Sequence, residues 1–150
     1  MKKTIKILSL ILVFVLSFSM MACSSFGKVE KILNELGYVE MNASEEGEQI
    51  QKESEVVVSA HFFSNAESIS ALELYKLTTV VVFEFNSTDD MLEFYNDSET
   101  LQGLMKDIEK EGSAKEFYNE LKDEGFAKGN CLIIPVGLDA ENVLDAFDKD

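Results

Sequence analysis

The sequence predicts a single α+β domain, in which a small, antiparallel-dominated sheet of about four strands carries helices on one face. Three observations predict this fold. Runs rich in β-branched and aromatic residues occupy 56–63 and 78–85, a composition typical of strands. A continuous apolar run at 131–136 adds a buried strand. Around and between these runs, apolar residues recur at helical spacing.

The first expected helix covers 28–36. Its apolar residues have the spacing i, i+3, i+4, i+7 of one helix face: Val29, Ile32, Leu33 and Leu36. Gly37 follows and suits the left-handed residue that ends many helices. The next residues, 38–41, suit a short strand.

The segment 42–55, NASEEGEQIQKESE, is polar and acidic and has no apolar period. We expect a flexible, solvated loop here. If the domain binds a basic partner protein, Glu45, Glu46 and Glu48 of this loop are the candidate contact residues.

The residues between the first two strand runs are ambiguous. Apolar side chains in 68–76 neither alternate cleanly nor gather on one helical face. We favour a further strand, which would complete an antiparallel meander, and a buried helix is the alternative.

Capping signals mark two helix starts in the second half. Ser87 precedes Asp90, and Ser113 precedes Glu116, with the spacing of a capping box. The first of these helices should pause at 96–99 and restart before Gly112. The restarted helix has its own apolar stripe: Leu101, Leu104, Met105 and Ile108.

The last strand and helix follow from similar signals. Pro135 cannot donate to a strand ladder, so it should lie at the end of its strand or on a sheet edge. Asp139 is the expected cap of the final helix. Leu138 and Val143 are spaced as a hydrophobic staple around it.

The front of the chain has the pattern of a secretory signal. MKKTIK is basic, and the apolar run that follows extends to residue 22. This run is shorter than the roughly 20 residues that a permanent membrane span needs.

The residues that end this run, Met20, Met21, Ala22 and Cys23, resemble the lipobox of bacterial lipoprotein precursors. The resemblance implies that residues 1–22 are a signal peptide that is removed. It also implies that Cys23 carries diacylglycerol and, on its new amino group, an acyl chain such as palmitate. Such a protein is held on the extracytoplasmic side of the cell membrane. An ordinary secretory signal with an incidental Cys23 is the alternative.

On this reading, residues 23–27 are a lipid-anchored tether and 28–150 are an acidic domain. The four residues after Cys23 would reach only about 14 Å when extended, so the domain would work close to the membrane. Two acyl anchors hold a protein to a bilayer far more stably than one.

The mature chain would carry ten lysines, no arginine and 28 acids, a net charge of −18. This balance argues against nucleic-acid binding, which depends on cations that neutralise phosphates. It equally argues against an electrostatic grip on anionic lipids. A basic envelope protein is the partner that such a charge favours.

No motif for catalysis, a metal or a cofactor is recognised. His61 is the only histidine, and a catalytic role would need a nucleophile beside it. With Cys23 lipidated, Cys131 stands alone in an apolar run and suits a buried position. We therefore expect a non-enzymatic binding domain. The alternative is a small envelope enzyme such as a glycan hydrolase, with two carboxylates about 5–9.5 Å apart.

Overall fold

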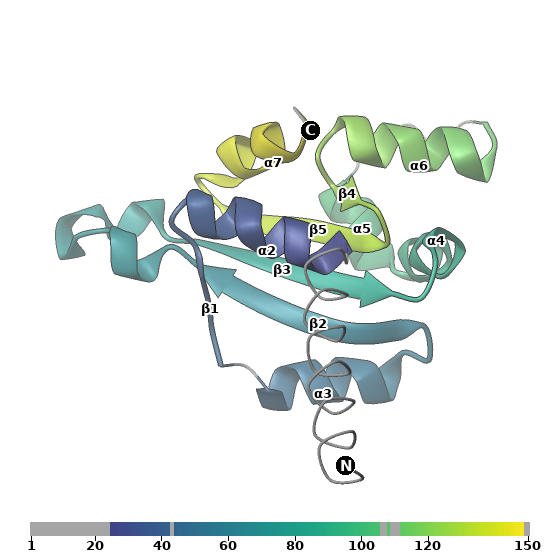
Figure 1. Cartoon of the computed structure of the whole chain (residues 1–150), viewed down its shortest axis with the longest axis horizontal. Helices are drawn as coiled ribbons and strands as arrows, with labels where there is room; N and C mark the ends of the chain where they lie inside the picture. The colour runs from purple at the N-terminus through teal and green to yellow at the C-terminus, as the bar shows by residue number, and fades with distance from the viewer. Residues whose placement is uncertain (1–24, 43, 106–107, 109–111, 149–150) are drawn as a thin grey trace, which may run out of the picture.

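The protein is a single α+β domain built on one five-stranded antiparallel sheet, as seen in a computed structural model that describes residues 25–42, 44–105, 108 and 112–148. The strand order is β1-β2-β3-β5-β4 (Figure 1). The strands are β1 (Val39–Glu40), β2 (Val57–Ser64), β3 (Thr78–Phe85), β4 (Ala127–Lys128) and β5 (Cys131–Gly137). The α+β prediction is confirmed. The extra strand is β4, whose two residues are too few to give a composition signal.

Six α-helices and two 3₁₀ segments are described. The helices are α2 (Ser25–Glu35), α3 (Ser44–Glu53), α4 (Thr88–Asp97), α5 (Glu99–Leu104), α6 (Ala114–Asp123) and α7 (Ala140–Asp148). The 3₁₀ segments, η1 (Ala66–Ser68) and η2 (Ala71–Lys76), lie between β2 and β3. In the described part of the chain, no helix combines the length and apolar character needed to cross a bilayer.

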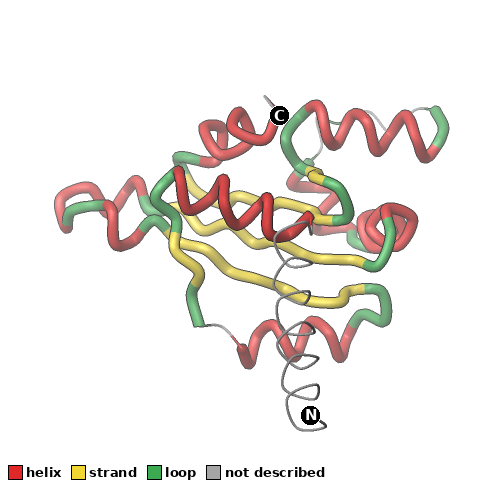
Figure 2. Tube along the Cα trace, in the orientation of Figure 1, coloured by secondary structure: helices red, strands yellow, loops and turns green. Residues whose placement is uncertain are grey.

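The helices cover both faces of the sheet rather than one, which corrects the prediction (Figure 2). Alternate side chains of the central strand enter two separate apolar cores. Val80 and Val82 join the core under α2 and α7. Phe83 and Phe85 join the core under α4, α5 and α6. The continuous apolar run at 78–85 is the sequence signature of such a strand, because a strand buried on both faces does not alternate with polar residues.

The helix α2 begins earlier than expected. Ser25, Phe26 and Gly27 form its first turn, so they are folded and not part of a tether. Phe26 packs against the core that contains the fully buried Val29 and Leu33. The helix ends at Glu35, and Gly37 supplies the predicted left-handed residue just after it, with a φ of 86° that glycine tolerates.

The segment 42–55 is not a flexible loop, since Ser44–Glu53 form α3. Glu, Gln and Lys are good helix formers, and pairs at i, i+4 add to this: Glu48–Lys52 at 3.6 Å and Gln49–Glu53 at 2.9 Å. The helix packs on β2 through Gly47, where a Cβ would lie 3.2 Å from the Ala60 carbonyl oxygen. A glycine contact leaves no apolar period for a sequence pattern to detect.

The prediction of a strand or a buried helix at 68–76 is wrong on both counts. Residues 71–76 form a 3₁₀ segment in which Leu72, Leu74 and Tyr75 are exposed. A strand here cannot lie between β2 and β3, as a meander would require, because β2 and β3 pair with each other directly.

The capping predictions are confirmed in most details. Ser87 accepts the Asp90 amide at 3.1 Å, and Ser113 and Glu116 form a complete capping box. The pause falls at Ser98, the cap of α5. Three details are wrong. The restarted helix α5 ends at Leu104, before it reaches Met105 and Ile108 of the predicted stripe. The side chain of Leu104 is 56% exposed, so it is not part of the buried face that its apolar stripe predicted. The side chain of Leu138 is 75% exposed, so it does not form the predicted hydrophobic staple.

Pro135 lies where β5 has a neighbouring strand on one side only. It faces Val80 of β3 on one side. On the other side β4 reaches only as far as Cys131 and Leu132, so the missing N–H of Pro135 removes no ladder bond.

Candidate functional site

Most of the exposed large apolar side chains gather at one end of the sheet. This is the end where β2 finishes, β3 begins and β5 finishes, since Val39, Ser64, Thr79 and Val136 lie in register across it. Of eleven such side chains in the described residues, eight lie here. We call this surface the apolar end: Leu36, Val39, Leu72, Leu74, Tyr75, Leu77, Val136 and Leu138.

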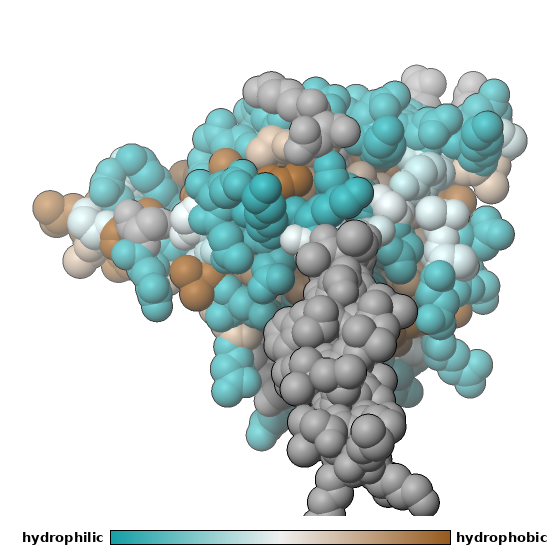
Figure 3. All heavy atoms as spheres, viewed as in Figure 1, coloured by the Kyte–Doolittle hydropathy of each residue, from teal (hydrophilic) through white to brown (hydrophobic). Residues whose placement is uncertain are grey.

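The β2–β3 connection projects from the apolar end and carries its most exposed members. Leu72 is 92% exposed, and Leu74 and Tyr75 are 62% and 63% exposed. Figure 3 shows brown, hydrophobic side chains on this projection at the left of the molecule. Such exposure is costly in water, and apolar surface of this kind marks interaction sites when several side chains gather.

The neck of the projection is held by Asn65, which is buried. Its side-chain amide donates to the Lys76 carbonyl at 3.1 Å, and its side-chain oxygen accepts the Thr78 amide at 2.9 Å. These two bonds join the start and the end of the connection. The apolar side chains are therefore presented from a fixed base.

A second set of hydrogen bonds ties this neck to the rest of the domain. The Thr78 hydroxyl accepts the Asp139 amide at 3.1 Å, and the Asp139 carboxylate accepts the Tyr38 hydroxyl at 3.1 Å. Burial, together with the charge of Asp139, raises the pKa of Tyr38 to about 12. The bonds link the start of β3, the β5–α7 turn and Tyr38, the residue before β1, so they tie the base of the projection to the rest of the domain.

The N-terminus of α2 lies at the opposite end of the sheet (Figure 1). The Ser25 side chain lies so close to Gly129, in the β4–β5 turn, that a Cβ there would clash. Phe26 stacks on His61 with ring centroids 3.8 Å apart. The eight residues of β3 separate the two ends by about 25 Å.

A polar cluster under Phe26 has the outline of a catalytic triad. His61 Nδ1 lies 2.7 Å from Glu40, and its Nε2 lies 3.0 Å from the Ser59 hydroxyl. However, this hydroxyl donates its hydrogen to Glu84 at 2.9 Å, so Ser59 is not set to give a proton to His61. Phe26 also covers the imidazole ring. The cluster joins β1, β2, β3 and α2, which is a structural role.

Carboxylates, which an enzyme would need, line two surface hollows in the part of the chain that the structure describes. One, of about 410 Å³, lies beside the start of β2 and α4 and is lined by Glu53, Glu55, Glu93 and Asp97. The other, of about 260 Å³, lies between α6 and α7 and is lined by Asp123, Glu124, Glu141, Asp145 and Asp148. Within the described residues, no group of three or more His, Cys, Asp or Glu is arranged to hold a metal. Both hollows are acidic surface depressions, and nothing else in the described residues that line them points to chemistry.

The predicted site residues are dispersed. Cys23 lies outside the described residues. Glu45, Glu46 and Glu48 lie on α3, where the side chains of Glu45 and Glu48 are exposed and Glu48 pairs with Lys52. Their role in partner binding stays a prediction.

The prediction that Cys131 is buried is confirmed. Cys131 is fully buried in β5, and burial raises the pKa of its thiol to about 12. A thiol in this state is a packing residue and not a nucleophile.

Sequence reasoning missed the apolar end. Its members look like core residues in the sequence, and the one available signal was negative: 68–76 fits neither a strand nor an amphipathic helix. No protein-family model matches this chain, and no curated protein or solved structure matches it significantly.

Proposed function

We propose that this protein is a lipid-anchored extracytoplasmic lipoprotein whose apolar end binds another envelope protein near the membrane. The observation that carries the proposal is the exposure of Leu72, Leu74 and Tyr75 on a projection with a fixed base. The anchor would be the lipid on Cys23.

The position of the anchor supports a protein partner over the anchoring membrane itself. Because α2 already begins at Ser25, a lipid on Cys23 would sit within about 7 Å of the folded domain. The projection that carries the most exposed members of the apolar end lies beyond the other end of β3, whose eight residues span about 25 Å. A domain that stands on its anchored end presents the apolar end to the extracytoplasmic space.

The charge of the chain indicates what surrounds the contact. The mature chain would carry −18, so a partner that covers Leu72 and its neighbours gains from a basic rim. Covering one Leu side chain fully contributes about 1.5–3 kcal/mol. Loss of one such side chain should therefore weaken binding roughly 10- to 150-fold.

The test is site-specific photo-crosslinking of the full chain in intact membranes. A photoreactive residue at position 72 should give a discrete adduct with a second, different protein. The same residue at Lys115, which is exposed on α6, should not. Purified, that protein should bind the domain more weakly as NaCl rises from 50 to 500 mM.

Matched variants separate binding from folding. Leu74→Ser with Tyr75→Ser should reduce the adduct at least tenfold without lowering stability, because both side chains are exposed. Leu104→Ser, at an exposed leucine outside the apolar end, should leave the adduct unchanged. Adducts only with lipid, only with a second copy of the chain, or equally strong at 72 and 115 contradict the proposal.

A further inference from the structure

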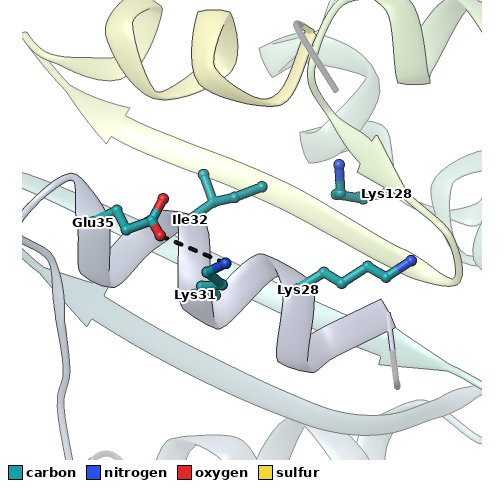
Figure 4. Close-up of a pocket in the computed structure, with 5 residues that line it drawn as sticks. All are labelled: Lys28, Lys31, Ile32, Glu35 and Lys128. Carbon is teal, nitrogen blue, oxygen red and sulfur yellow. Dashed lines mark ion pairs between the residues drawn. The ribbon is translucent and has the colours of Figure 1, made fainter. Parts of the chain in front are cut away.

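A pocket of about 320 Å³ lies between α2 and β4, and three lysines line it. They are Lys28 and Lys31 of α2 and Lys128 of β4, with Ile32 as an apolar wall and Glu35 at one side. In Figure 4, Lys28 extends along α2 on the side where Lys128 stands, and Lys31 lies beside Glu35. The volume is within the range of small-ligand sites.

The lining of this pocket is positively charged, whereas the chain as a whole is negatively charged. The mature chain would have ten lysines against 28 acids, yet three of the ten line this pocket with a single glutamate. That glutamate, Glu35, pairs with Lys31 at 3.8 Å. Lys28 has no ion-pair partner among the described residues. The lining therefore has an excess of positive charge in a domain that otherwise repels anions.

The fold fixes the backbone positions from which these lysines project, while the side chains of Lys28 and Lys31 are exposed. Val29 and Leu33, the neighbours of Lys28 and Ile32 along α2, are fully buried, so this helix cannot turn its lysines away. Lys128 is half-buried and lies in β4, which pairs with β5. The contact between Ser25 and Gly129 holds the first turn of α2 against the β4–β5 turn.

We infer that this pocket is a binding site for a phosphate-bearing anion of the size of a phosphoglycerol group. Lysine ammonium groups bind phosphate oxygens as point charges. The apolar wall formed by Ile32 accommodates the carbon part of the ligand. Sequence composition argued against anionic lipid, but composition averages over the whole chain and cannot register three lysines that meet at one place.

Two sources offer this chemistry: the headgroup of an anionic phospholipid and a free phosphate ester. The lipid source rests on the proposed anchor, since Lys28 is five residues from Cys23 and would lie at the bilayer surface. The free source does not need the anchor. The inference is independent of the apolar end.

The experiment uses the chain from residue 23 onward with Cys23→Ser, because both hydrophobic cores lie within residues 26–147. Calorimetric titrations employ inorganic phosphate, glycerol 3-phosphate and dihexanoyl-phosphatidylglycerol below its micelle concentration. Dihexanoyl-phosphatidylcholine is the zwitterionic control. We expect saturable binding of the phosphoglycerol probes that is at least tenfold tighter than that of the zwitterionic lipid.

Matched charge variants decide whether the pocket is responsible. Lys28→Gln, Lys31→Gln and Lys128→Gln together should weaken binding at least tenfold. Lys52→Gln, Lys115→Gln and Lys122→Gln remove the same charge from exposed positions elsewhere and should change it less than twofold. Circular dichroism checks that both triple variants fold.

The probes distinguish the two sources. Phosphatidylglycerol binding ten times tighter than glycerol 3-phosphate assigns the pocket to a lipid headgroup, and equal affinities assign it to a free ester. No saturable binding of any phosphate probe, or equal loss in the two triple variants, overturns the inference. Neither result bears on crosslinking from position 72, so the two proposals fail separately.

Discussion

Replacing Asn65 with Ala should destabilise the domain and loosen the projection that carries the apolar end. The change removes two hydrogen bonds at the neck, at 3.1 Å to the Lys76 carbonyl and at 2.9 Å from the Thr78 amide. Thr78 is fully buried, so its N–H would lose its acceptor without gaining water.

The magnitude follows from these two bonds. An unsatisfied buried N–H costs about 1–3 kcal/mol, and an ordinary hydrogen bond that water can replace costs about 1 kcal/mol. The expected loss in the free energy of unfolding is therefore about 2–4 kcal/mol. In a domain of this size, that corresponds to a decrease in Tm of roughly 8–16 °C.

Urea unfolding followed by far-UV circular dichroism measures this loss. Asn119→Ala, at an exposed asparagine of α6, is the matched control and should stay within about 0.5 kcal/mol of the wild type. The slope of the free energy against urea should not change, because the folded core is the same. If Asn65→Ala behaves like Asn119→Ala, the neck does not hold the projection and the argument for a fixed base fails.

Three further predictions test other parts of the structure. The thiol of Cys131 should react with a disulfide reagent at pH 8 only after unfolding. Because its pKa is about 12 in the folded chain against an ordinary value of 9.0, the unfolded chain loses this proton first, and the free energy of unfolding should fall as pH rises from 9 toward 12. Cys131→Val should reduce that fall, measured by urea titrations at pH 8 and 10.5. Glu45→Gln, Glu46→Gln and Glu48→Gln together should weaken a basic partner in low salt, measured by titration calorimetry, and unchanged affinity would remove α3 from the binding surface. Gly47→Val should displace α3 from β2, because the space beside the Ala60 carbonyl holds no branched side chain, and amides of 44–53 should then exchange faster with deuterium; unchanged exchange would refute the close packing.

The sequence predicted the sheet well because strand composition is a local property. The range 78–85 matches β3 at both ends, and the Ser113–Glu116 capping box is present in full. Each of these features depends on residues within a few positions of one another. The two-sided burial of β3 also has a local signal, because its apolar run lacks alternation, although the prediction places helices on one face only.

The errors share a cause, which is that exposure depends on what lies beyond the segment. Leu72 and Leu74 are core-type residues, and only the direct pairing of β2 with β3 forces their connection out of the sheet. The helix at 44–53 depends on Gly47 packing on a strand that starts ten residues later. The lysine pocket brings together α2 and β4, a hundred residues apart in the chain. None of these juxtapositions has a local signal.

The proposed location of the domain and the proposed direction of its apolar end both depend on a lipid at Cys23. Mass spectrometry of the mature chain purified from bacterial membranes tests this directly, with Cys23→Ala as the control. We predict an N-terminal peptide that begins at Cys23 and carries a thioether-linked diacylglycerol and an amide-linked acyl chain. A mature chain that begins at another residue, or an unmodified Cys23, would contradict the proposal that the domain is lipid-anchored.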